Sequence, residues 1–86
     1  LPNRAGAVTS RIAGRVTWIG VAEGDSVRKG DPVVEVESLQ LGDPPPRARY
    51  SAPLSGRVVD RHVVAGDSVE PNAHLLEVAD PGKNMG

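Results

Sequence analysis

Residues 13–38 (AGRVTWIGVAEGDSVRKGDPVVEVES) and residues 55–80 (SGRVVDRHVVAGDSVEPNAHLLEVAD) can be written one above the other without a gap. Corresponding residues differ by 42 in number, as Gly14 does from Gly56. The two stretches also share an identical block, Gly-Asp-Ser-Val, at 24–27 and 66–69. An ungapped match of this kind indicates an internal duplication, so we interpret the chain as two copies of one supersecondary unit.

Each copy has the pattern of a strand, a turn, a short extended piece, a second turn and a closing strand. In the closing strands apolar and acidic residues alternate, as in VVEVE at 33–37, which predicts one buried and one exposed face. Glycine supplies positive φ in the turns and aspartate bonds nearby backbone groups. The residues that we expect to form these turns are Gly24, Asp25, Gly30, Gly66 and Asp67.

Neither copy can bury its apolar face alone, because a single hairpin is marginally stable in water. We therefore predict an all-β fold, a flattened barrel or sandwich of two antiparallel sheets with about eight strands and two pseudo-twofold-related halves. Residues 11–80 are expected to form this single domain, with residues 39–52 as the loop between the copies. Residues 1–10 and 81–86 are small or polar and are expected to be flexible ends.

Composition excludes several functions. The 86 residues carry 10 basic and 11 acidic side chains, so the balance gives no electrostatic footprint for nucleic acid. There is no cysteine to act as a nucleophile or thiolate ligand, and no run is apolar enough for a transmembrane helix. No catalytic motif stands out, so we expect a protein that is not an enzyme and has no cofactor. We also expect the chain to be a piece of a longer protein.

The pattern resembles the biotinyl/lipoyl domain fold over nearly the whole chain. The resemblance is carried by Gly-Arg-Val at 14–16, EGDSVRKGD at 23–31, VVEVES at 33–38 and SAPLSGRV at 51–58. In carriers of this fold a modified lysine lies in the turn between the copies. Here that region reads LGDPPPR at 41–47, and the chain's two lysines are Lys29 and Lys83. Arginine cannot replace the lysine, since its guanidinium stays protonated.

Without that lysine, the domain is similar to the one in periplasmic adaptors, the membrane fusion proteins of tripartite RND-type efflux systems, especially the heavy-metal branch. In these adaptors a helical hairpin is inserted between the copies. The residues at the corresponding insertion site here are Leu41, Gly42, Pro44, Pro45, Pro46 and Tyr50. Three consecutive prolines forbid a helix, so we expect the hairpin to be absent.

This resemblance implies a structural and interaction module of a transenvelope export conduit. Its partners would be neighbouring adaptor subunits and an inner-membrane transporter, and its location the periplasm, in a parent protein attached to the inner membrane. The isolated domain is expected to be monomeric, because few exposed aromatic residues are available to drive association. Two alternatives are a lipoyl or biotin carrier domain, which needs a lysine at the tip, and a small metal-binding chaperone.

The metal-binding alternative depends on His62, His74 and Met85, with carboxylates such as Asp60 or Asp67 as further ligands. No spacing motif links the two histidines, and histidines without a metal are the commoner case in proteins.

Trp18 is a candidate interface residue, because the second copy has Asp60 at the same place. Strict alternation puts Val16 and Trp18 on one face of their strand and Thr17 and Ile19 on the other. Trp18 therefore either contacts a neighbouring subunit or covers the core.

Overall fold

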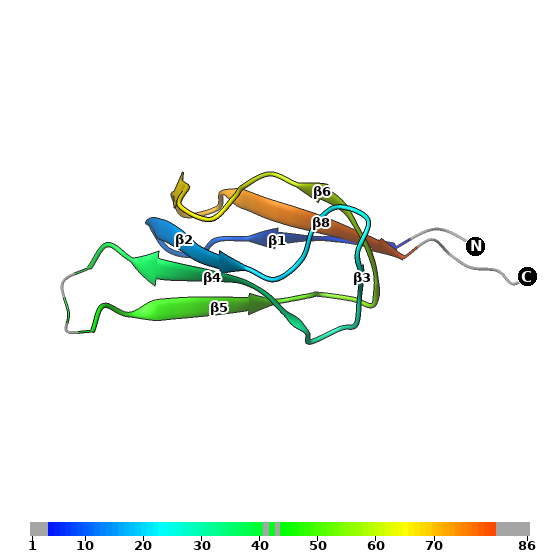
Figure 1. Cartoon of the computed structure of the whole chain (residues 1–86), viewed down its shortest axis with the longest axis horizontal. Helices are drawn as coiled ribbons and strands as arrows, with labels where there is room; N and C mark the ends of the chain where they lie inside the picture. Colours follow the sequence, from blue (N-terminus) through cyan, green and yellow to red (C-terminus); the bar gives the residue numbers. More distant parts are fainter. Residues whose placement is uncertain (1–3, 41, 43, 81–86) are drawn as a thin grey trace, which may run out of the picture.

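The computed structural model describes residues 4–40, 42 and 44–80, which form a sandwich of two four-stranded antiparallel sheets (Figure 1). None of the described residues is helical. The predicted all-β fold with about eight strands is confirmed. The strands are β1 Arg4–Thr9, β2 Gly14–Ile19, β3 Ser26–Val27, β4 Pro32–Ser38, β5 Arg47–Ser51, β6 Gly56–Arg61, β7 Ser68–Val69 and β8 His74–Asp80.

Strand exchange between the two copies builds both sheets. One sheet has the order β1-β8-β6-β3 and the other β5-β4-β2-β7. Strands β1 to β4 come from the first copy and β5 to β8 from the second, so each sheet takes two strands from each copy. A copy by itself keeps only one long strand pair, β2 with β4 or β6 with β8.

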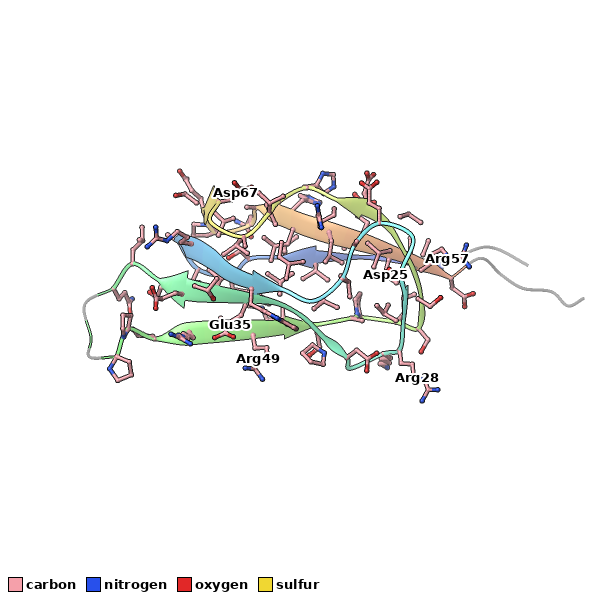
Figure 2. All side chains as sticks on the ribbon, in the orientation of Figure 1. Asp25, Arg28, Glu35, Arg49, Arg57 and Asp67 are labelled. Atoms are coloured by element: carbon pink, nitrogen blue, oxygen red, sulfur yellow. The ribbon has the colours of Figure 1, made fainter. Side chains whose placement is uncertain are left out.

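Reciprocal backbone hydrogen bonds join the turns of one copy to the long strands of the other. The Val58 N–H donates to Asp25 O and the Gly24 N–H to Val58 O, both at 2.8 Å. In the equivalent arrangement of the other copy, Val16 N–H donates to Asp67 O and Gly66 N–H to Val16 O, again at 2.8 Å. Figure 2 shows Asp25 and Asp67 displaced toward opposite ends of the sandwich. The turn of each copy is therefore held in place by backbone hydrogen bonds to a long strand of the other copy.

The expectation that residues 1–10 are a flexible end is wrong for residues 4–9, which form edge strand β1 on β8. Likewise, residues 39–52 are not all loop, since β5 lies at 47–51 on β4. Strands β1 and β5 are equivalent under the 42-residue offset. Val8 of β1 pairs with Leu76 of β8, and the residues 42 positions away from these, Tyr50 of β5 and Val34 of β4, also pair with each other. The duplication thus spans residues 4–38 and 46–80. Within β1, glycine suits position 6 because a Cβ there would collide with the Pro53 ring.

The core lies between the sheets and is almost entirely valine and leucine, with Ser10 as a buried polar residue whose hydroxyl donates to Ile12 O at 2.7 Å. Valine suits strands because its branched side chain packs well on a pleated surface. The buried apolar residues are Val8, Val16, Val27, Val33, Val34, Val36, Ala52, Val58, Val69, Leu75, Leu76 and Val78.

A β-bulge in β2 corrects the predicted face of Trp18. The register between β2 and β4 shifts between Val16 and Trp18, so strict alternation fails there. Val16 stays buried and Ile19 packs against the core, whereas Trp18 is 42% exposed. A single extra residue reverses every side chain that follows it. Strand β6 has the equivalent bulge between Val58 and Asp60.

The expected turn residues lie in tight turns. Gly24, Gly30 and Gly66 have φ of 93°, 93° and 100°, the left-handed region that glycine adopts easily. The carboxylate of Asp25 accepts a hydrogen bond of 2.9 Å from the backbone N–H of Ala22, which lies three residues earlier in the chain. Asp67 does the same with Val64 at 3.0 Å. These aspartates therefore close their own turns.

Candidate functional site

The connection between β4 and β5 is the place where a carrier domain would hold its modified lysine. Its residues, 39–46, include no lysine. Ser38 N–H donates to Pro46 O at 2.7 Å, which closes the base of the connection, and Leu39 N–H donates to Ala13 O at 3.2 Å. Gly42, Pro44 and Pro46 are exposed and Pro45 is half-buried, whereas Leu41 and Asp43 lie outside the described residues.

Lys29 lies far from this connection. It belongs to the turn between β3 and β4, is exposed, and donates its backbone N–H to Ser55 Oγ at 2.9 Å. Figure 2 shows its neighbour Arg28 at the opposite end of the sandwich from the 39–46 connection. Lys83 lies outside the described residues. Among described side chains, the arrangement presents no amine at the tip.

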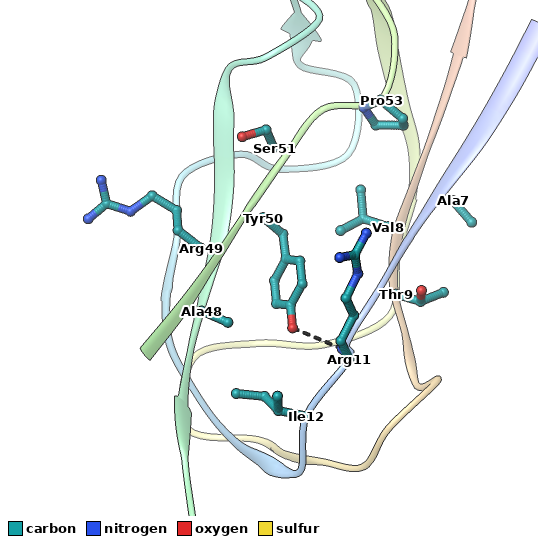
Figure 3. A pocket seen from close by; sticks show the side chains of 10 residues that line it. All are labelled: Ala7, Val8, Thr9, Arg11, Ile12, Ala48, Arg49, Tyr50, Ser51 and Pro53. Atoms are coloured by element: carbon teal, nitrogen blue, oxygen red, sulfur yellow. Dashed lines mark hydrogen bonds between the residues drawn. The ribbon is translucent and has the colours of Figure 1, made fainter. Parts of the chain in front are cut away.

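Tyr50 is not in the insertion loop, where the sequence pattern placed it, but in strand β5. It is half-buried in a groove between the edge strands β1 and β5 (Figure 3). Its hydroxyl accepts the backbone N–H of Arg11 at 2.9 Å. This bond joins strand β5 to the connection between β1 and β2, so Tyr50 has a structural role.

The outer face of β2, β4 and β5 carries an aromatic and basic surface around Trp18. The indole lies over Gly20, where any Cβ would overlap the ring. Beside it, Glu35 Oε2 is 3.3 Å from Arg47 Nη1 and Glu35 Oε1 is 3.4 Å from Arg49 Nη2. These residues, with Thr17 and Pro32, line one shallow depression. We call it the Trp18 surface.

The outer face of β6 and β8 is the equivalent surface of the second copy, with different chemistry. Asp60, His62 and Glu77 offer ligand atoms that all lie within 4.8 Å of one another. His62 Nε2 is 3.5 Å from Glu77 Oε2. The His74 ring packs edge-on to that of His62, with centroids 6.3 Å apart. We call the first three residues the acidic-imidazole cluster.

The structure brings together only part of the metal-ligand set suggested by the sequence. His62, His74 and Asp60 lie on one face, but Asp67 closes a turn, and Met85 lies outside the described residues. Sequence reasoning missed Glu77, which pairs directly with Asp60 across the two strands. The repeat offers a signal for it, because Glu35 and Trp18 pair in the same way in the first copy.

None of the described residues belongs to a helix long and apolar enough to cross a bilayer.

A sequence profile of the CzcB-like, barrel-sandwich hybrid domain family matches residues 4–80, which is nearly the whole chain. The matched stretch begins with β1 and ends with β8, so it covers both copies of the repeat and the connection between them.

Among curated proteins, a pyruvate carboxylase subunit of Methanocaldococcus jannaschii is 53% identical over 36 residues, which are 42% of this chain and 6% of that protein. A solved single-chain, multi-domain long-chain acyl-CoA carboxylase has a similar fold, with a TM-score of 0.73 and 23% identity over 91% of this chain and 7% of that one. The ectoine utilization protein EutE (DoeB) of Ruegeria pomeroyi has a TM-score of 0.69 and 27% identity over 86% of this chain and 22% of that one. The chain therefore corresponds to a small part of each of these proteins.

Proposed function

Since this chain belongs to the family of CzcB-like barrel-sandwich hybrid domains, we propose that it is a non-enzymatic structural module of a periplasmic efflux adaptor. In this proposal it packs beside the same domain of neighbouring adaptor subunits in a conduit that exports heavy-metal cations across the cell envelope. Its parent protein is attached to the inner membrane and works with an inner-membrane transporter of the RND type. The fold serves as a rigid spacer and contact surface, and catalysis has no part in its role.

The observation that supports this proposal best is the lysine-free connection at residues 39–46. The connection lies at one end of the sandwich, and the paired outer ends of β1 and β8, Arg4 with Asp80, lie at the other (Figure 1). A module with this layout separates the parts of a protein that are attached at its two ends, and the separation equals the length of the sandwich. The interlocked copies make such a spacer stiff, because backbone hydrogen bonds run both ways between them.

The Trp18 surface is the proposed contact with a neighbouring subunit. Exposed large apolar residues are few and scattered among the described residues, namely Trp18, Leu39, Val59 and Val64. Such isolated residues do not drive stable association by themselves. The domain alone is then monomeric, and packing side by side depends on the neighbouring parts of the parent protein. Tryptophan and arginine together are typical of the residues that dominate binding energy in interfaces.

Replacing Trp18 by alanine in the full-length parent protein is expected to weaken subunit assembly by about 30-fold. That change corresponds to about 2 kcal/mol, a common value for an interface tryptophan. Sedimentation velocity of the purified protein and metal tolerance of cells carrying the variant measure the effect. Val64→Ala, at another exposed apolar position, is the matched control and should assemble normally. Normal assembly of Trp18→Ala with a lowered melting temperature would contradict the contact and assign Trp18 to stability.

The carrier function is the second candidate, and the observation behind it is the 53% identity over 36 residues to part of a pyruvate carboxylase subunit. It requires an acylated lysine, and Lys29 lies in the turn between β3 and β4 next to Arg28, which Figure 2 shows at the end of the sandwich away from the connection.

We expect the intact mass of the chain, co-expressed with a biotin ligase and separately with a lipoate ligase, to equal the mass of the unmodified sequence. The reason is that residues 39–46 present no amine to the ligase. A known carrier domain expressed in the same cells serves as the positive control. A biotinyl or lipoyl increment on this chain would overturn the adaptor proposal.

A further inference from the structure

We propose that the acidic-imidazole cluster, Asp60, His62 and Glu77, is a binding site for a borderline divalent cation such as Zn²⁺. It lies on the outer face of the β1-β8-β6-β3 sheet, away from the Trp18 surface on the other sheet. The site goes beyond the proposed function and does not depend on it. Three features support it: the spacing of the ligand atoms, the absence at Glu77 of the arginine partners that Glu35 has in the first copy, and the hydrogen-bonded backbone beneath the ligands.

The ligand atoms are close to the spacing that a metal ion needs. Zinc bound by imidazole nitrogen and carboxylate oxygen at about 2.0–2.2 Å in tetrahedral geometry separates its ligands by about 3.3 Å. His62 Nε2 and Glu77 Oε2 are 3.5 Å apart, and the carboxylate of Asp60 completes a set within 4.8 Å. All three side chains reach water, so small rotations of exposed groups bring Asp60 inward.

The two carboxylates of this cluster, Asp60 and Glu77, face each other, whereas the equivalent glutamate of the first copy faces arginines. Asp60 and Glu77 are direct cross-strand neighbours, an arrangement that is unfavourable for two carboxylates. In the first copy the residue equivalent to Glu77 is Glu35, and it is paired with Arg47 and Arg49. A bound cation would supply the positive charge that those arginines supply to Glu35.

The second copy has no arginines at the equivalent positions. Under the 42-residue offset Arg47 and Arg49 correspond to Ala5 and Ala7 of strand β1, and Ala7 pairs with Glu77. Within the part of the chain that the structure describes, the polar side-chain contact of Glu77 is the one with the His62 ring. The sequence difference between the copies therefore leaves two carboxylates beside one imidazole.

The backbone under the cluster is held in place. Asp60 lies in the central strand β6 opposite Glu77 in the central strand β8. Just beyond the end of β6, the His62 N–H donates to Leu75 O at 2.9 Å. Leu75 and Leu76 beside Glu77 are fully buried and fix the strand. Two ligands on paired strands and a third held directly beside them need little backbone ordering when the ion binds, which favours affinity.

The ligand types select the class of cation. One imidazole with two carboxylates suits Zn²⁺ and similar ions, whereas Mg²⁺ and Ca²⁺ prefer oxygen ligands alone. Three protein ligands leave one position of a tetrahedral ion open to water or to another side chain. His74 is the chain's other histidine, and its ring packs edge-on to that of His62, where it would orient His62 or occupy the open position.

Titration of the ¹⁵N-labelled 86-residue chain with zinc chloride in a non-chelating buffer at neutral pH tests the site. Histidine ring correlation spectra are expected to shift for His62 first, and calorimetry is expected to give one Zn²⁺ per chain. His62→Gln and Glu77→Gln should each lower the affinity for Zn²⁺ at least tenfold, as loss of a ligand does in metal sites. Thermal melts of the metal-free variants show whether they are folded.

Glu35→Gln is the matched control, because Glu35 occupies the same place as Glu77 in the first copy and carries the arginine pairs instead. It should leave the affinity for Zn²⁺ unchanged, and a tenfold excess of Mg²⁺ should not displace Zn²⁺. Three results overturn the proposal: no change at His62 with millimolar zinc, equal losses for Glu35→Gln and Glu77→Gln, or displacement of Zn²⁺ by Mg²⁺.

Discussion

Each half of the chain, prepared as a separate peptide of residues 1–42 or 43–86, is expected to be unfolded, and an equimolar mixture of the two is expected to fold. The reason is the exchange of strands between the copies. Strand β1 pairs with β8 and β3 pairs with β6, so a first half alone loses the partners of both. It keeps only β2 with β4, and a two-stranded pair is marginally stable in water.

Burial in the core gives a second, energetic reason. Val16, Val34 and Val36 of the first half are fully buried, and the sandwich has a core only when both sheets are present. Far-UV circular dichroism and amide chemical-shift dispersion of each peptide and of the mixture measure the effect. The intact chain is the reference for the folded state. Native-like dispersion of either half alone at micromolar concentration would contradict the interlocked arrangement and show that one copy is a sufficient folding unit.

Gly14→Ala and Gly56→Ala are expected to destabilise the domain by about 3 kcal/mol each, a large share of the roughly 5–15 kcal/mol of a typical small domain. A Cβ at Gly14 would overlap the carbonyl oxygen of Glu37, and one at Gly56 would overlap that of Ala79. These are backbone atoms of the central strands β4 and β8, which no side-chain rotation can move aside. Denaturant unfolding followed by tryptophan fluorescence measures the loss.

Gly24→Ala is the matched control for these two substitutions. Gly24 has a φ of 93° but open space around its Cβ position, so alanine there meets only the backbone penalty of about 1 kcal/mol. Gly14→Ala and Gly56→Ala measure the cost of steric overlap in the sheets, whereas Gly24→Ala measures the conformational cost in a turn. The difference in free energy of unfolding between them distinguishes the two costs. A loss for Gly56→Ala no larger than that for Gly24→Ala would mean that the strands can separate to admit a methyl group.

The duplication was visible in the sequence because it is a property of residue identity and spacing. The offset of 42 residues, the alternation in the closing strands and the glycine–aspartate turns all act locally, over a few residues each. These signals were enough to predict the fold class, the pseudo-twofold and the lysine-free connection. They missed the strand character of residues 4–9 and 47–51, whose sequences, RAGAVT and RARYS, resemble each other too little to reveal the repeat.

The tertiary structure alone decided which side chains meet on the outer faces. The bulges after Val16 and Val58 add one residue to each strand and so reverse the faces of Trp18 and Asp60, and their local sequences, RVTWI and RVVDR, carry no distinct mark of this. Pairing of Asp60 with Glu77 joins residues far apart in the chain through backbone hydrogen bonds, which any residue but proline can make. Local patterns therefore specify strands and turns, whereas register across the sheet determines where a surface site forms.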